Sequence, residues 1–150
     1  MAERAYTTRR LGIISALVDK IKDIDGTGVF LTNVNENVSP RLKFWDEIEE
    51  FPAVHLNAGS ESREYQGGGY KDRYLTVTLR CYVQEEDAVA ALDALLEDVE
   101  TILEENSRLL YKDRNNADQY TQQITIISIN TDEGVLEPYG VGEMQIEVHY

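Results

Sequence analysis

The sequence predicts an α+β fold, one domain over residues 1–150 in which two main helices pack on a mainly antiparallel sheet of four to five strands. Residues 74–83 alternate strictly between apolar and polar side chains, which is typical of a half-buried strand. Directly after it, residues 88–103 repeat apolar side chains at helical spacing and predict an amphipathic helix. Residues 144–150 alternate again and predict a last strand. Each of these elements has one apolar face, so they must cover one another.

The N-terminal part predicts a first helix and a first strand. Thr7 or Thr8 can cap the helix, and one apolar stripe follows the cap: Leu11, Ile14, Leu17, Val18 and Ile21. The glycines of residues 25–28 end the helix in a turn. Residues 29–34 are then expected to form the first strand.

A short helix and a second strand are expected next. Ser39 and Pro40 favour the start of a helix, which Phe51-Pro52 would end. Residues 54–56 predict a strand, and residues 57–72, rich in Gly and Ser, predict a long loop that is mobile until it contacts a partner.

The chain after the long helix predicts a hairpin. A polar passage at residues 112–119 is followed by an isoleucine-rich strand at 124–129, a turn at 131–140 and the last strand. The expected order is therefore α-β-(short α)-β-β-α-β-β. We expect the last strand to pair within its own sheet, because a local hairpin loses little loop entropy. The alternative is pairing with the sheet edge of a neighbouring subunit.

The charge of the chain limits the classes of partner. Against 14 basic residues stand 28 acidic ones, so the net charge is −14. Such a chain repels phosphate, and sequence-specific nucleic-acid binding is not expected to be its role. The single cysteine, Cys81, lies on the apolar side of a predicted strand, which indicates a buried thiol without a disulfide. We find no secretory signal and no apolar run long enough for a bilayer, so we expect a cytoplasmic protein without a membrane partner.

The sequence predicts no catalytic residue, no metal site and no cofactor. His55 and His149 lie on predicted strands outside any catalytic motif. A zinc site needs four Cys or His ligands at short spacing, and this chain has only three such residues, far apart. The glycines of residues 67–69 lack the Gly-Lys-Ser/Thr that a phosphate-binding loop requires.

Three groups of side chains are candidate contact residues. The polar face of the long helix is acidic without a basic residue, which fits a solvated face, a contact with a basic neighbour or the wall of a passage for a polyanion: Glu86, Asp93, Glu97, Asp98, Glu100 and Glu104. Near the N-terminus, Arg4, Arg9 and Arg10 are either solvated or meet an acidic partner surface. Tyr65 and Tyr70 flank three glycines and are efficient contact residues once placed.

Several stretches resemble the tail terminator (tail completion) proteins of long-tailed bacteriophages. They are Phe51-Pro52-Ala53-Val54, Gly59-Ser60-Glu61, the strand at 74–83 before an acid-bounded helix, and the ending from Gly140 to Tyr150. The resemblance extends from about Arg41 to Tyr150 and consists of hydrophobic patterns and turns. It implies a non-enzymatic subunit of a hexameric ring that caps the tail tube, stops its polymerisation and offers a surface to the filled head. It also implies that DNA passes through the lumen without specific binding.

The same resemblance implies the partners and the location. The partners would be further copies of the chain, the tail tube protein and a head-completion or neck protein. The location would be the head-proximal end of the virion tail, after assembly in the host cytoplasm. Two other classes remain open: a connector of the head–tail neck, and a small-molecule-binding or enzymatic α+β domain. A stable monomer with a polar pocket would favour the latter.

Overall fold

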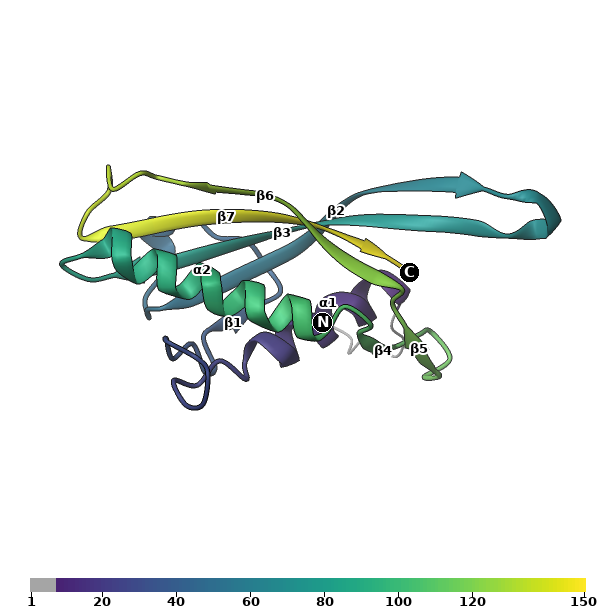
Figure 1. The fold of residues 1–150 in the computed structure, drawn as a ribbon, viewed down its shortest axis with the longest axis horizontal. Helices are drawn as coiled ribbons and strands as arrows, with labels where there is room; N and C mark the ends of the chain where they lie inside the picture. The colour runs from purple at the N-terminus through teal and green to yellow at the C-terminus, as the bar shows by residue number, and fades with distance from the viewer. Residues whose placement is uncertain (1–7) are drawn as a thin grey trace, which may run out of the picture.

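The computed structural model describes residues 8–150 (Figure 1), so Arg4 lies outside the described residues. In chain order the elements are α1 (Arg9–Ile21), β1 (Val38–Ser39), a 3-10 turn η1 (Trp45–Glu47), β2 (Ala53–Tyr65), a 3-10 turn η2 (Gly67–Gly69), β3 (Lys71–Gln84), α2 (Ala88–Glu105), β4 (Leu110–Lys112), β5 (Asp118–Tyr120), β6 (Gln123–Thr131) and β7 (Tyr139–His149).

A five-stranded sheet forms the centre of the fold, with strand order β1-β2-β3-β7-β6. Every pairing in it is antiparallel except the short parallel pairing of β1 with β2. This confirms the predicted α+β class. The last strand, β7, lies inside its own subunit's sheet between β3 and β6, so the expected local hairpin is confirmed and pairing of β7 with a neighbour is excluded.

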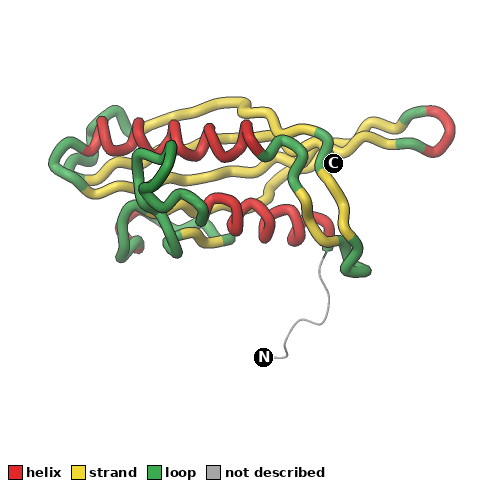
Figure 2. Tube along the Cα trace, turned by 60° about the horizontal axis from the view of Figure 1, so that its bottom comes forward, coloured by secondary structure: helices red, strands yellow, loops and turns green. Residues whose placement is uncertain are grey.

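The two faces of the sheet differ in chemistry. On the inner face Leu75, Val77 and Leu79 of β3 are fully buried and belong to one core cluster with residues of α1 and α2. Figure 2 shows both helices running along the sheet. Polar side chains of β3 and β7 alternate with the buried ones and remain half-exposed on the opposite face, which the helices leave uncovered: Thr76, Thr78, Arg80, Glu143, Gln145 and Glu147.

Helix α1 begins where the sequence predicts and packs unusually close to β4. The Thr8 side chain accepts a hydrogen bond of 3.1 Å from the Leu11 N–H and caps the helix. The predicted stripe is buried except for Leu11, which is 41% exposed. A Cβ on Gly12 would lie 2.2 Å from the Lys112 carbonyl oxygen, so only glycine permits this approach.

Helix α2 buries the apolar face that its spacing predicts. Its cap is Asp87, whose side chain accepts a hydrogen bond of 3.2 Å from the Ala90 N–H. Its buried apolar residues are Ala88, Leu92, Leu95, Leu96, Val99, Ile102 and Leu103. A Cβ on Gly142 of β7 would come within 3.2 Å of Leu92, so α2 and the sheet approach closely there.

The predicted strand at residues 29–34 is wrong, because this segment is a loop held by a side chain instead of a strand ladder. Val29 and Leu31 are 70% and 64% exposed. The Asp98 carboxylate accepts hydrogen bonds from the Leu31 N–H at 3.0 Å and from the Thr32 N–H at 2.8 Å. A carboxylate on α2 thus satisfies the backbone donors that a neighbouring strand would have satisfied.

The predicted short helix after Ser39 is also wrong. Val38 and Ser39 form β1 and pair in parallel with Val54 and His55. Downstream of β1, only the 3-10 turn η1 is helical before β2 begins.

The predicted loop at residues 57–72 is instead a continuous pair of strands. The register of β2 and β3 runs to Tyr65↔Lys71, with one shift between Ala58 and Glu61. Most side chains from Asn57 to Tyr65 are exposed on both faces, so no alternation revealed the strand. The polar passage at 112–119 likewise contains a small hairpin, β4–β5, whose turn is closed by hydrogen bonds from the Asn115 and Ala117 N–H groups to Asp113.

Candidate interaction surfaces

The most prominent surface feature is a two-stranded projection, residues 62–73, which we call the arm. Strand β7 pairs with β3 only from Tyr74 onward, so the arm has no third strand. It extends beyond the rest of the sheet in both views (Figures 1 and 2). At its tip Tyr65 and Tyr70 are 73% and 76% exposed. Tyrosine is enriched among residues that dominate protein interfaces, so the tip is suited to contact a partner.

The tip has a defined backbone conformation. Gly68 and Gly69 have φ of 78° and 83°, which glycine adopts at little cost. The Gln66 N–H donates a hydrogen bond of 2.7 Å to the Tyr70 carbonyl oxygen and closes the turn. The two tyrosines are therefore held at the ends of a short, closed connection.

The C-terminal residue fixes the base of the arm. The Tyr150 hydroxyl donates a hydrogen bond to the Glu61 carboxylate, and the Tyr150 N–H donates one of 3.0 Å to the Arg73 carbonyl oxygen. The Arg73 guanidinium lies 5.5 Å from the centre of the Tyr150 ring. One residue therefore contacts both strands where the arm leaves the sheet.

Neighbouring side chains add to this attachment. His149 Nε2 lies 3.0 Å from Asp72 Oδ1, and the His149 ring stacks on Tyr74 with 4.6 Å between ring centres. Arg10 donates a hydrogen bond to the Gly59 carbonyl oxygen of β2. Of the arginines predicted as contact residues, Arg10 is therefore engaged within the chain, whereas Arg9 is exposed.

The electrostatics of the base favour an ionised Glu61. Burial alone would raise the pKa of the Glu61 carboxyl, but hydrogen bonds from Tyr150 and from Arg63, at 2.7 Å, outweigh it and hold that pKa below its ordinary value of 4.5. Burial, together with the Glu61 charge, raises the pKa of Tyr150 to about 12. The pair is thus a neutral donor on an anionic acceptor.

The acidic side chains of α2 do not form one uniform face. Most of the predicted set are exposed: Glu86, Asp93, Glu97 and Glu104, with Glu100 half-exposed. Asp98 differs, because it is 2% exposed and its carboxylate is occupied by the loop at Leu31 and Thr32. Its inclusion in the polar face of the helix is a correction to the sequence analysis, since helical spacing does not reveal a polar group buried under a loop.

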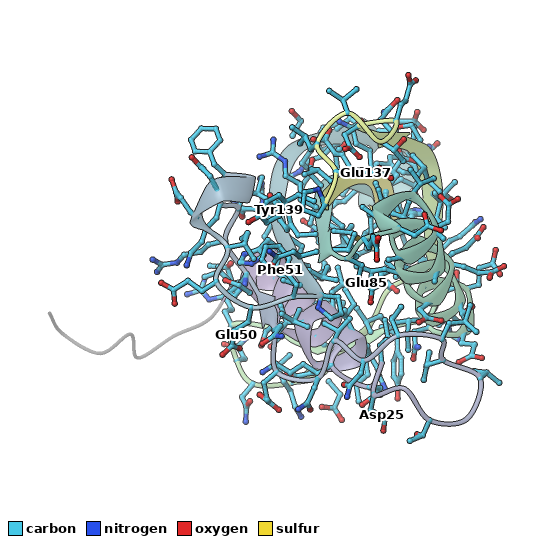
Figure 3. The ribbon with its side chains drawn as sticks, turned by 90° about the vertical axis from the view of Figure 1, so that its left-hand side faces the viewer. Asp25, Glu50, Phe51, Glu85, Glu137 and Tyr139 are labelled. Carbon is cyan, nitrogen blue, oxygen red and sulfur yellow. The ribbon has the colours of Figure 1, made fainter. Side chains whose placement is uncertain are left out.

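A cleft lies at the end of the subunit opposite to the arm, and the sequence analysis did not predict it. Its volume is about 300 Å³, and its lining comes from the 31–33 loop, the two residues before β2, the end of β3 and α2: Leu31, Thr32, Asn33, Phe51, Pro52, Val83, Gln84, Glu85 and Ala91. The Phe51 ring packs against Tyr139 with 5.8 Å between ring centres. Figure 3 shows Phe51 and Glu85 facing this end of the subunit. The only signal for it in the sequence is Phe51-Pro52, and this pair predicts the end of a helix and not a cleft.

The sheet has two long edges that are unpaired among the described residues. One is β6, on which Ile127 and Ile129 are 56% and 43% exposed. The other is β2 beyond His55, because β1 covers only Val54 and His55. Unpaired edges present free N–H and C=O groups to another strand.

The Cys81 thiol and the His55 imidazole are buried and lie on opposite faces of the sheet, because Cys81 pairs with Val54 and His55 with Arg80. Burial raises the pKa of the Cys81 thiol to about 12, so the thiol stays protonated near neutral pH. Burial likewise lowers the pKa of His55, whose Nδ1 lies 2.8 Å from the Arg41 carbonyl oxygen. Within residues 8–150 there is no group of three or more His, Cys, Asp or Glu that could hold a metal ion. No helix of that described part is long and apolar enough to cross a membrane.

Comparison with known proteins gives consistent matches. The family described as Bacteriophage Tail Tube Terminator Protein matches residues 7–150. The tail tube terminator protein of Escherichia phage T5 is 32% identical over 149 residues, which cover 94% of this chain and 92% of that protein. A chain in the virion of a native gene transfer agent particle has a similar structure, with a TM-score of 0.58, 8% identity, and coverage of 92% of this chain and 93% of that chain. At that identity the structural likeness concerns the fold alone.

Proposed function

We propose that this chain, which belongs to the family of bacteriophage tail tube terminator proteins, ends the tail tube as a closed hexameric ring of identical subunits. It is a structural component of the virion tail and not an enzyme. The ring stops addition of further tube subunits and provides the surface to which the filled head attaches. It occupies the head-proximal end of the tail and assembles in the host cytoplasm.

The observation that supports a ring most strongly is the direction of the two unpaired sheet edges. Strands β2, β3, β7 and β6 alternate in direction across the sheet, so β2 and β6 run opposite to each other. In copies related by rotation about an axis roughly along the strands, β6 of one copy meets β2 of the next in antiparallel orientation. This is a favourable hydrogen-bonding geometry, and such side-by-side head-to-tail contacts close into a ring when the rotation between copies permits.

Such a ring would have a polar inner wall. Helices α1 and α2 cover one face of the sheet, and closing sheets into a ring leaves room for a helical layer on the outside. The acids of α2 are then outer contact residues, and the uncovered face surrounds the lumen. Its Arg80 is paired with Glu143 at 3.2 Å. A wall with few unpaired basic side chains displaces few of the counterions that DNA phosphates bind. DNA therefore passes through the lumen without binding to it.

The arm is the element we assign to the tube side. Its two exposed tyrosines lie at the end of a two-stranded projection that extends beyond the rest of the subunit. They can therefore contact a ring of other subunits stacked on this one. The tail tube protein is therefore the partner of the arm. A head-completion or neck protein is the partner of the opposite end.

Native mass spectrometry and electron microscopy of the purified protein with tail tubes test this function. We expect a closed ring at one end of each tube. Deleting residues 65–70 should weaken binding to the tube and leave the melting temperature nearly unchanged, because these residues lie outside the core. A protein that stays monomeric at high concentration, in high salt and with tubes present would contradict the ring. A variant that loses folding stability as strongly as binding would show that the arm tip is structural. Binding to heads without tails would indicate a neck connector instead.

A further inference from the structure

We infer that the cleft opposite the arm binds a basic segment of a head-side virion protein, which inserts one aliphatic or aromatic side chain between Leu31, Phe51 and Ala91. The inference rests on the proposed function, because it takes the arm to be the tube-side end of the subunit. It adds the location of the head-side contact and the chemistry of its partner.

The cleft has the size and lining of an anchor site. A volume of about 300 Å³ accommodates one large apolar side chain, and the cleft is lined by apolar groups from four separate segments. Leu31 at its wall is 64% exposed although it is a large aliphatic residue. The Asp98 carboxylate holds the loop that positions Leu31, with N–H···O distances of 3.0 Å. The apolar wall is therefore preformed and not a frayed segment.

Carboxylates are numerous at this end of the subunit. Glu85 lines it, and Glu50, Glu137 and Asp25 face the same end of the subunit (Figure 3). No lysine or arginine is among the lining residues. Along the chain, residues 44–53 and 84–93 each contain four acidic residues and no basic one. Asp25 already accepts hydrogen bonds from Thr27, at 3.0 Å from its N–H and 2.6 Å from its hydroxyl, so Glu50, Glu85 and Glu137 are the groups that would meet a cation.

The negative charge near the cleft favours a basic partner. An apolar anchor flanked by lysine or arginine places its cations against Glu50, Glu85 and Glu137, whereas an acidic segment or DNA would be repelled. The same charge would speed the encounter of two large particles and would make the rate of joining fall with salt.

A second copy of this chain is the poorer occupant. The arm tip does combine tyrosines with Arg63 and Lys71, but Glu64 and Asp72 offset them. Moreover, an arm-to-cleft contact joins opposite ends of the subunit (Figures 1 and 3), so each added copy would offer a fresh cleft to the next. Contacts that join opposite ends along the long axis add copies end to end, and they extend into an open filament unless a rotation closes them. That outcome is opposite to ending a tube.

Site-directed cross-linking tests the contact. A photoreactive p-benzoylphenylalanine replaces Asn33, an exposed residue at the cleft wall, and tails capped with this protein are mixed with DNA-filled heads from a tail-deficient lysate. We expect a cross-linked peptide from a head-side protein with a net positive charge and an apolar residue at the adduct. A cross-link to residues 65–70 of a second copy, a cross-link to the tail tube protein, or no cross-link with heads would each overturn the inference.

Charge and shape variants test its consequence for assembly. Leu31→Arg fills the cleft and Glu85→Lys reverses its charge, and both residues are exposed, so the fold should tolerate them. Asp19→Lys, at an exposed acid of α1 that does not line the cleft, is the matched control for the charge reversal. We expect the two cleft variants to reduce the yield of joined particles on the order of tenfold or more. Ring mass and tube ending should stay at the wild-type level. Unchanged joining would overturn the inference while leaving the proposed function intact, and a wild-type protein that fails to end tubes would refute the function itself.

Discussion

The hydroxyl of Tyr150 donates a hydrogen bond to the carboxylate of Glu61, a residue 89 positions earlier in the chain. The bond joins the C-terminal residue to the strand that leads into the arm. Tyr150 directly follows β7, which is an inner strand of the sheet, so the bond attaches the base of the arm to the centre of the fold. The stability of the subunit and the position of the arm are therefore linked through one side chain.

Replacing Tyr150 with Phe should destabilise the subunit. The Glu61 side chain is only 7% exposed, so it would lose a donor that water replaces poorly. We expect the free energy of unfolding to fall by about 1.5–3 kcal/mol, the range for a hydrogen bond to a charged group. Urea denaturation measures the change. Tyr65→Phe at the arm tip is the control and should stay within about 0.5 kcal/mol of wild type. Equal stability of the two variants would show that the bond does not contribute.

Glu61 should make the protein less stable in acid. Its folded pKa lies below its ordinary value of 4.5, so the unfolded chain binds the proton more tightly. The stabilisation is therefore present above pH 4.5 and is lost as the pH falls through the folded pKa. Asp25 and Asp113, whose pKa values are also lowered, act in the same direction. The Glu61→Gln variant should accordingly lose less stability than wild type between pH 5 and 3. Parallel stability curves for the two proteins would contradict this assignment.

Asp98→Ala should lower the free energy of unfolding more than removal of any exposed acid of α2. Without the carboxylate, the N–H groups of Leu31 and Thr32 lose their acceptor, and an unsatisfied donor costs roughly 1–3 kcal/mol. Asp93→Ala on the same helix should change stability by no more than about 0.5 kcal/mol, because that side chain is exposed. Thermal unfolding compares the two variants. Hydrogen exchange should also show faster exchange at residues 31 and 32 in Asp98→Ala alone.

Gly12→Ala should destabilise the protein although alanine favours helices. The propensity gain of about 1 kcal/mol would be outweighed by the collision of the new Cβ with the Lys112 carbonyl oxygen at 2.2 Å. Overpacking of this kind costs about 1–3 kcal/mol or more, since α1 must move away from β4. Gly67→Ala is the control, because a Cβ there has no neighbour within 4 Å. A stabilised Gly12→Ala variant would show that the contact between α1 and β4 yields easily.

The elements that the sequence predicts correctly are those with one buried face. Strand β7 and helix α2 bury alternate or helically spaced residues, so their apolar pattern indicates both the element and its orientation. The arm and the loop around Leu31 have no such face. Strand β2 beyond Asn57 is held by its ladder to β3, and the Leu31 loop is held by Asp98. Contacts between segments that are tens of residues apart leave no periodic pattern of apolar residues in the local sequence.

Some of the candidate surfaces can be predicted from the sequence, and others depend on the tertiary fold. Tyr65 and Tyr70 could be singled out because two aromatics beside three glycines are conspicuous in the sequence. The cleft could not, since Leu31, Phe51, Val83 and Ala91 meet there only through the tertiary fold. Asp98 was grouped with the other acids of α2 because its burial depends on a loop from a distant part of the chain.

The most direct test of the terminator account is the length of tail tubes assembled with the purified protein present. Tube subunits are allowed to polymerise with and without it, and lengths and ends are measured by electron microscopy. The account predicts that tubes stop growing once the protein is added, with one ring at one end of each tube. Tubes that continue to lengthen at the same rate, with no ring at either end, would contradict it.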